Sequence, residues 1–346
     1  MNKTALVYHE DYLKHRQPEG HPERPERLVE TLNYFEKKGL LEKLTIVKPE
    51  VAKREDLLRV HSRELVDFME NLCSSGGGFL DSDTFVCRDT CYVARLSAGG
   101  VIKAAEVVME GKFDNSFALV RPPGHHASRN KSMGFCYFNN VAVMIKYIQE
   151  KYDLKRILVL DWDAHAFNGT MDIFYDTRDV LKISIHQDPR TLYPGTGFIS
   201  QIGSGIGEGY TVNVPVPAGT EDSDYVYIFD EIVIPLAFDY KPQFMVISAG
   251  QDSHRDDPLS GLCLTESGYE EMTNILLKTS EELCDGRLVV ELEGGYNLES
   301  LKKSNYAIVS SLIGDRRDET IKGKVKDSIK ELAGSLKKIL GNYHTI

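Results

Sequence analysis

The chain has 346 residues, of which 42% are hydrophobic and 27% charged, and its formal net charge at pH 7 is −11. These proportions exclude an intrinsically disordered chain and a collagen-like one, and no apolar run reaches the roughly 18 residues of a membrane span. A chain this acidic, with no run of five Lys or Arg residues, is a poor binder of nucleic acid. We therefore expect neither nucleic acid nor a membrane among its partners.

The N-terminal segment and the cysteines indicate a reducing compartment. The short apolar stretch at the start is interrupted by His9, Glu10 and Asp11, unlike a secretory signal, and the six cysteines form no CxxC pair. We expect a cytoplasmic protein with reduced thiols and without a structural zinc site.

Short β-branched runs alternate with longer helical patterns along the chain. The predicted strands are residues 5–8, 116–120, 156–160, 180–185, 243–248 and 287–292. Several of them, such as 157–160, are apolar at nearly every position, which is typical of strands covered on both faces. Helical patterns cover residues 90–110, 137–152, 222–237, 265–283 and 299–312. The alternation predicts an α/β fold with helices on both faces of a parallel sheet.

The remaining patterns favour one domain over residues 1–346. Residues 322–340 carry apolar side chains at three- and four-residue spacing with lysines between them, which predicts an amphipathic helix packed on the domain. Residues 74–78 predict a flexible loop, too short for a domain linker, and we find no internal repeat.

Residue types that bind metals follow three of the predicted strands. Asp161, Asp163 and His165 lie two positions apart and share one side of an extended chain. Asp252 and Tyr296 lie in the segments after the strands at 243–248 and 287–292. Ligands of open α/β sheets bind beyond the carboxyl ends of the strands. Two carboxylates and one imidazole from these segments would form a three-ligand site with a position left open, as catalytic zinc sites do.

A separate segment holds the pair His125 and His126, which could act as general base and then general acid. Tyr296 follows a glycine pair and could donate a hydrogen bond to a developing oxyanion. Each pattern alone also fits a purely structural role. The Asp-x-Asp-x-His segment could be a capped turn, the histidine pair could lie on the surface, and Gly-Gly-Tyr could be an ordinary turn held by its aromatic ring. Their joint occurrence at strand ends and loops favours the functional interpretation.

Together these segments resemble the histone deacetylase superfamily, which includes acetylpolyamine amidohydrolases and acetoin-utilisation proteins. The resemblance covers nearly the whole chain, and the RPPGHH wording is closer to the class II branch. The matching motifs are residues 21–27 (HPERPER), 61–62 (HS), 121–126 (RPPGHH), 133–136 (MGFC), 193–197 (YPGTG), 257–259 (DPL) and 294–298 (GGYNL). The resemblance implies an arginase-like single-domain fold on an eight-stranded parallel sheet. It also implies hydrolysis of N-acetyl amides with one zinc ion.

The resemblance implies two cation sites. Asp163, His165 and Asp252 would bind Zn²⁺, and Fe²⁺ and Co²⁺ suit the same ligands. A monovalent cation, usually K⁺, would lie close by, held by Asp161, Asp163, His165, Ser184 and Ile185.

The resemblance also implies catalytic roles. His126 would be the general base and acid, with Asn168 as its partner. His125 would stay hydrogen-bonded to Asp161 and help to hold the reacting water, and Tyr296 would stabilise the oxyanion.

A narrow acyl tunnel is implied as well. Phe135 and Tyr193 would form its two walls, beside Gly134. Leu259 stands where polyamine-selective animal enzymes of the family have a glutamate, which disfavours that selectivity. Asp83 lies roughly where the family has a rim carboxylate that holds the substrate backbone.

One segment departs from the family pattern. The family usually reads DxHHGNGT, whereas this chain has Ala166 and Phe167 in place of the second histidine and the first glycine. If that glycine position requires a positive φ, Phe167 would be strained.

The leading hypothesis is a zinc-dependent amidohydrolase that removes acetyl or another short acyl group from acyl-lysine or a small acylated amine. The alternatives are a weakly active or inactive zinc-containing module that binds acylated amines, and an acetylpolyamine amidohydrolase. A two-manganese ureohydrolase such as arginase is disfavoured by the ligand order. A homo-oligomer is compatible with the sequence.

Overall fold

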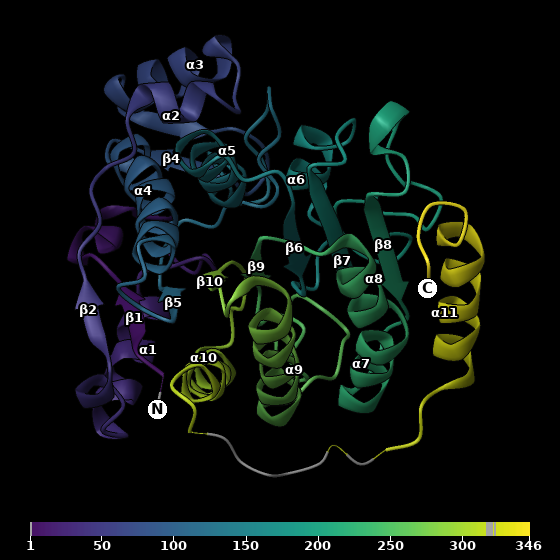
Figure 1. Cartoon of the computed structure of the whole chain (residues 1–346). Coiled ribbons are helices and arrows are strands. Elements are labelled where there is room, and N and C mark those ends of the chain that lie inside the picture. Colours follow the sequence, from purple (N-terminus) through teal and green to yellow (C-terminus); the bar gives the residue numbers. More distant parts are fainter. Residues whose placement is uncertain (1, 316–320, 322) are drawn as a thin grey trace.

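The computed structural model describes residues 2–315, 321 and 323–346, and its centre is an eight-stranded parallel sheet (Figure 1). The strands lie in the order β2-β1-β5-β10-β9-β6-β7-β8. Their bounds are β1 Thr4–Val7, β2 Thr45–Val47, β5 Asn115–Ala118, β6 Ile157–Asp161, β7 Val180–Gln187, β8 Thr211–Val216, β9 Phe244–Ala249 and β10 Leu288–Leu292. This confirms the predicted α/β class and the parallel sheet.

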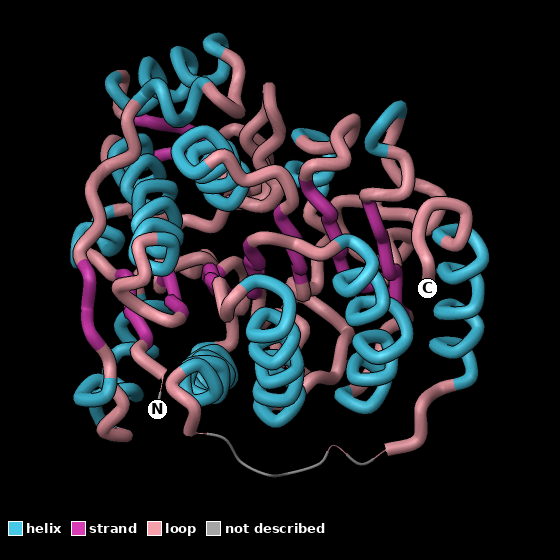
Figure 2. The backbone as a smooth tube through the Cα atoms, in the orientation of Figure 1, coloured by secondary structure: helices cyan, strands magenta, loops and turns pink. Residues whose placement is uncertain are grey.

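Helices cover both faces of the sheet (Figures 1 and 2). One layer holds α4 (Thr90–Met109), α5 (Asn140–Tyr152) and α6 (Asn168–Ile173). The other layer holds α1 (Glu26–Lys37), α7 (Asp222–Ile228), α8 (Ile234–Tyr240), α9 (Glu266–Cys284) and α10 (Leu298–Leu312). Between α7 and α8 the chain makes a π-helical turn, Phe229–Val233. One hydrophobic core joins the sheet to both layers, since strands such as β6 are buried at every position.

Smaller elements lie at the ends of this framework. Helices α2 (Arg54–Leu58) and α3 (Arg63–Ser74) precede an antiparallel hairpin of β3 (Gly77–Phe79) and β4 (Phe85–Cys87). Short 3-10 turns span Glu10–Lys14, Leu41–Lys43 and Gly205–Gly207. No helix in the described part of the chain is both long and apolar enough to cross a membrane.

The six predicted strands are all present, but two edge strands were not predicted. β2 has only three residues, two of them exposed, and so lacks an apolar run. In β8, Asn213 and Pro215 interrupt the apolar pattern. Proline is tolerated on an edge strand, where one side of the ladder stays unpaired. The predicted loop at 74–78 is also wrong, because residues 77 and 78 belong to β3.

The C-terminal helix α11 (Asp327–Leu340) lies along the β8 edge of the sheet (Figure 1). It buries Ile329, Ala333, Leu336 and Leu340, so only Ile329 and Leu336 of the predicted apolar face are buried, while Leu332 and Ile339 are half-buried. The predicted start at residue 322 lies outside the described residues, and residues 323–326, which the prediction included, are not helical.

Candidate active site

The sheet order brings three strand ends together. β10, β9 and β6 are neighbours, and Asp161, at the end of β6, pairs in register with Ser248 of β9. The segments that follow these strands therefore meet at one edge, as expected for parallel strands. Asp163 and His165 arrive from β6, Asp252 from β9 and Tyr296 from β10.

Asp163, His165 and Asp252 place one potential ligand atom each within 4.8 Å of one another. His165 Nδ1 lies 3.1 Å from Asp163 Oδ1 and 3.1 Å from Asp252 Oδ2. Burial and the neighbouring Asp163 carboxylate raise the pKa of Asp252 to about 7. Burial alone lowers the pKa of His165, but the two carboxylates more than offset this and raise it to about 10. The cluster thus carries a buried excess of negative charge.

Glycine backbones keep the space around these ligand atoms open. A Cβ on Gly250 would overlap the Asp163 carboxylate, and a Cβ on Gly294 would overlap both Asp163 and Asp252. The Gly294 amide also donates to Asp163 Oδ2 at 2.9 Å. Two carboxylates and one imidazole in an open cradle fit the donor set of a catalytic zinc site.

Hydrogen bonds distinguish the two adjacent histidines. His125 Nδ1 lies 2.9 Å from Asp161 Oδ2, and His126 Nδ1 lies 2.7 Å from Asn168 Oδ1. Each Nδ1 faces an acceptor oxygen and therefore carries the proton. The Nε2 lone pair of a neutral His126 is then free to accept a proton.

The surroundings shift the pKa values of the two histidines in opposite directions. Burial lowers the pKa of His125, but the Asp163 and Asp161 carboxylates outweigh it and raise that pKa well above its usual range. Burial and the neighbouring His125 hold the pKa of His126 well below its usual range. His126 is therefore the uncharged member of the pair.

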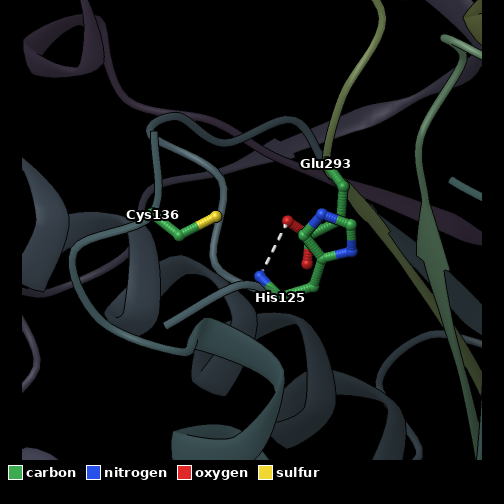
Figure 3. A group of neighbouring side chains, drawn as sticks. All are labelled: His125, Cys136 and Glu293. Atoms are coloured by element: carbon green, nitrogen blue, oxygen red, sulfur yellow. Dashed lines mark hydrogen bonds between the residues drawn. The ribbon is translucent and has the colours of Figure 1, made fainter. Parts of the chain in front are cut away.

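A second cluster consists of His125, Cys136 and Glu293, whose side chains lie close together (Figure 3). The Glu293 carboxylate accepts the backbone N–H groups of Gly124 at 2.7 Å and His125 at 3.2 Å, and the Ser248 hydroxyl at 2.8 Å. Because Glu293 and the His125 ring already have partners, this cluster supports the histidine segment rather than presenting free ligands. Sequence reasoning gave Glu293 and Cys136 no role, since their partners lie far away in the chain.

Tyr296 is held by two residues that the sequence did not single out. Arg27 donates from Nε to the Gly295 carbonyl at 2.7 Å, and its guanidinium lies 5.0 Å from the centroid of the Tyr296 ring. The Asp257 carboxylate accepts the backbone N–H of Tyr296 at 2.6 Å. Arg27 belongs to the HPERPER motif, which drew attention to this segment. The motif does not reveal that Arg27 contacts the Gly295 carbonyl.

One cavity of about 340 Å³ is lined by three of the predicted catalytic and metal-binding residues, His126, His165 and Tyr296, and by the five residues expected at the tunnel. The lining does not include His125, Asp163 or Asp252. The complete lining is His21, Pro22, Asp83, His126, Gly134, Phe135, His165, Leu192, Tyr193, Leu259 and Tyr296. His21, Pro22 and Leu192 are additions from the structure.

The cavity wall at Phe135 has an unusual backbone. Gly134 and Phe135 adopt φ values of 58° and 66°, in the left-handed region. A Cβ on Gly134 would overlap the His126 ring, so only glycine fits there. The turn places the Phe135 ring 5.8 Å from that of Tyr296, and the Tyr193 ring lies 5.0 Å from that of His126.

Known proteins resemble this chain in sequence and in structure. A sequence profile of the histone deacetylase domain matches residues 21–312. The chain belongs to the histone deacetylase family. It is 47% identical over 314 residues to a probable deacetylase of Archaeoglobus fulgidus, covering 90% of this chain and 86% of the relative.

A second curated relative and a solved structure show the same likeness. The chain is 39% identical over 328 residues to histone deacetylase 15 of Arabidopsis thaliana, covering 92% of this chain but 58% of that longer protein. The crystal structure of the HDA15 HD domain matches with a TM-score of 0.92 and 35% identity, covering 99% of this chain and 96% of that one. The fold of this chain is therefore that of a histone deacetylase domain.

The departure from the deacetylase pattern causes no backbone strain. Phe167 has φ −73°, is fully buried and precedes α6, so the position does not use a positive φ. Ala166 is also buried, next to Gly197, whose carbonyl accepts the His186 Nε2–H at 2.9 Å. The ring of His186 thus occupies space beside Ala166.

The residues expected around a monovalent cation in deacetylases are neighbours in the sheet. Asp161 of β6 pairs in register with Ser184 of β7, and Ile185 follows. The Asp163 backbone N–H donates to Asp161 Oδ1 at 2.9 Å, and the His165 N–H to Asp163 Oδ1 at 2.9 Å. Asp163 and His165, which also belong to the three-ligand cluster, are thus connected to Asp161 by backbone hydrogen bonds.

Proposed function

We propose that this chain is a metal-dependent deacetylase that hydrolyses the amide bond of an acetylated or short-acylated amine, with acetyl-lysine as the leading substrate. The observation that carries the proposal is that His126, His165 and Tyr296 line one cavity, while the ligand atoms of Asp163 and Asp252 lie within 4.8 Å of that of His165. Membership of the histone deacetylase family supports the same reaction class.

Asp163, His165 and Asp252 would hold Zn²⁺, with Fe²⁺ or Co²⁺ as other occupants of the same donor set. The ion supplies a Lewis acid that polarises the acyl carbonyl and acidifies water. The fit rests on the buried negative excess of the cluster and on the glycine cradle of Gly250 and Gly294. Asp161, Asp163, His165, Ser184 and Ile185 would hold K⁺.

His126 accepts the proton of the attacking water at Nε2 and later donates it to the nitrogen of the departing amine. Asn168 fixes the ring by accepting the Nδ1 proton. His125, paired with Asp161, remains charged beside the reacting atoms and stabilises the negative charge that develops there.

Tyr296 donates a hydrogen bond from its hydroxyl group to the carbonyl oxygen as that oxygen becomes an anion. Burial raises the pKa of this hydroxyl well above its usual range, so the tyrosine stays protonated and can donate. The rings of Phe135 and Tyr193 leave a narrow apolar passage that suits the methylene chain of a lysine. Asp83 at its mouth would accept a backbone N–H of a peptide.

The test is hydrolysis by protein stripped of metal with a chelator and reloaded with Zn²⁺, measured as release of the free acid. We expect turnover of an acetyl-lysine peptide and one bound divalent ion per chain. Faster turnover of acetylputrescine would favour the polyamine alternative, and two ions per chain would favour a ureohydrolase. No turnover of any acylated amine by the reloaded protein would overturn the proposal.

Tyr296→Phe sharpens this test. We expect kcat to fall on the order of 100-fold with little change in KM, because the hydroxyl acts on charge that appears only in the transition state. The matched control is Tyr343→Phe, which alters an exposed tyrosine and should leave both constants unchanged. A tenfold change in KM at constant kcat would make Tyr296 a binding residue only.

A further inference from the structure

Two buried cysteines lie against each other outside the catalytic machinery. Cys73 is in the last turn of α3, and Cys91 is in the first turn of α4. The backbone N–H of Cys91 donates to Cys73 Sγ with an N···S distance of 3.2 Å. The contact places the Cys73 sulfur directly against the backbone of Cys91. The two residues are only 4% and 8% exposed.

The surroundings divide the two thiols into a donor and an acceptor. A side-chain hydrogen bond with the Cys73 thiol lowers the pKa of Cys91; burial and the Glu70 carboxylate oppose this, and Arg95 and Arg54 support it. The same side-chain hydrogen bond and burial raise the pKa of Cys73, which therefore keeps its proton. A lowered pKa favours the thiolate of Cys91, and a thiolate beside a thiol is the arrangement from which disulfides form.

The segment between the two cysteines carries the rim of the cavity. Residues 74–90 contain the hairpin of β3 and β4, and Asp83 at its tip lines the cavity. Thr84 Oγ1 accepts the backbone N–H of Phe135 at 3.2 Å, and His21 Nε2–H donates to the Asp83 carbonyl at 2.9 Å. A covalent link between Cys73 and Cys91 would therefore close the base of the hairpin that borders the cavity.

We propose that Cys73 and Cys91 are a redox modification site, forming a reversible disulfide when a hydroperoxide oxidises them. The Cys91 thiolate attacks one peroxide oxygen, which gives a sulfenic acid and releases hydroxide. Cys73 then attacks the sulfenic sulfur, the S–S bond forms, and the sulfenic oxygen leaves as water with the thiol proton. In total, two thiols and hydrogen peroxide give one disulfide and two waters. This inference does not depend on the proposed catalytic activity.

The test treats the folded protein with hydrogen peroxide, blocks the remaining thiols with N-ethylmaleimide and maps the cross-links by mass spectrometry. A protease that cleaves before aspartate separates the three nearby cysteines into residues 67–80 (Cys73), 83–88 (Cys87) and 89–113 (Cys91). We expect 67–80 joined to 89–113, lighter than the sum of the two peptides by two hydrogens and released by dithiothreitol. A link from 83–88 to 89–113, or no link, would overturn the proposal.

Matched variants check the assignment. Cys91→Ser should abolish the cross-link, whereas Cys284→Ser, at a buried thiol on α9, should retain it. If Cys91→Ser does not fold, Cys73→Ser serves in its place. The oxidised wild type should melt a few degrees higher than the reduced protein, because the closed loop restricts the unfolded chain. If the fully cross-linked protein melts at a lower temperature than the reduced protein, the native geometry does not suit a Cys73–Cys91 disulfide.

Discussion

Two groups of buried charge lie next to each other in this molecule, and they differ in how the charge is balanced. Around Glu23, one carboxylate meets two guanidinium groups. Arg121 Nη2 lies 2.8 Å and Arg27 Nη1 3.3 Å from the carboxylate oxygens. Burial opposes ionisation of Glu23, but the arginines outweigh it and hold its pKa well below the usual range. In the three-ligand cluster the ratio is reversed, with two carboxylates sharing the one imidazole of His165.

The difference separates a structural ion pair from a binding site. A buried charge is tolerated when partners compensate it. The Glu23 group has a surplus of positive charge. The Arg27 guanidinium donates a hydrogen bond to the Gly295 carbonyl and lies over the Tyr296 ring. The three-ligand cluster has a surplus of negative charge, which a bound cation would compensate. One group thus completes the fold and positions Tyr296, while the other has the charge of a site that would bind a cation.

The largest expected effect is a loss of kcat when His126 or His125, next to the three-ligand cluster, is replaced. We expect His126→Ala to lower kcat on an acetyl-lysine peptide by about 10²- to 10⁴-fold, the usual contribution of a general base. His125→Ala should cost less, because His125 contributes charge rather than proton transfer. Steady-state kinetics of both Zn²⁺-loaded variants measure the difference. Equal activity of His126→Ala and the wild type would contradict the assignment.

Breaking the compensated group should destabilise the fold. Glu23→Gln leaves two buried guanidinium groups without their counter-charge, which typically costs about 3–5 kcal/mol of unfolding free energy. Urea denaturation at pH 7 measures this. The control is Glu30→Gln, which removes a half-exposed ion pair with Lys302 and should cost under about 1 kcal/mol.

The pH dependence of the same variant gives an independent check. The pKa of Glu23 is lower in the folded than in the unfolded state, where it is about 4.3. The carboxylate therefore stabilises the fold fully above about pH 5, and this stabilisation is lost progressively as the pH falls through the folded-state value. The gap between wild type and Glu23→Gln should narrow below about pH 4.5. A difference in unfolding free energy that widens below pH 4.5 would contradict the assignment of Glu23 as the ionised counter-charge of the two arginines.

The contrast between the two groups also explains what the sequence could and could not predict. Asp161, Asp163 and His165 are neighbours in the chain, so their alternation after a buried strand indicates a site directly. Arg27 reaches Gly295 across 268 positions, and no local pattern announces such a contact. β8 was missed for a related reason, because its edge position allows the Pro215 that interrupts its pattern. The family resemblance supplied the catalytic roles and the partners of His125 and His126, but the contacts of Arg27 and Asp257 with the Tyr296 segment came only from the fold.

Lys182 provides a third case, a single buried cation without a carboxylate partner in the described part of the chain. Its ammonium donates to the carbonyls of Phe174 and Thr177, and burial lowers its pKa to about 7. Between pH 7 and pH 10 the unfolded chain keeps the proton that the folded chain has lost. Wild-type stability should therefore rise with pH relative to Lys182→Met, by up to about 1.4 kcal/mol per pH unit.

Urea denaturation at pH 7, 8.5 and 10 measures that slope. Lys324→Met, at an exposed lysine, is the control and should run parallel to the wild type. A Lys182→Met variant that also runs parallel would mean that Lys182 is protonated throughout and compensated by groups other than a carboxylate.

The smallest expected effect concerns the departure beside the ligand His165. The double variant Ala166→His with Phe167→Gly restores the DxHHGNGT motif that is usual in deacetylases. Because Phe167 is unstrained at φ −73° and the His186 ring lies beside Ala166, the surroundings are adapted to the present residues. A new imidazole at position 166 enters a buried site bordered by Gly197, and a glycine at 167 leaves the volume of a buried phenyl ring empty.

Zn²⁺ affinity and kcat of the double variant should therefore change by tenfold or less, or decline, within the range that changes next to a metal ligand produce. The single variant Phe167→Gly separates the cavity from the new histidine and should lose stability without gaining activity. Both are measured on Zn²⁺-loaded protein with the same acetyl-lysine peptide. If the wild type is inactive and the double variant gains orders of magnitude in turnover, the present chain is a binding module whose three-ligand cluster no longer supports hydrolysis.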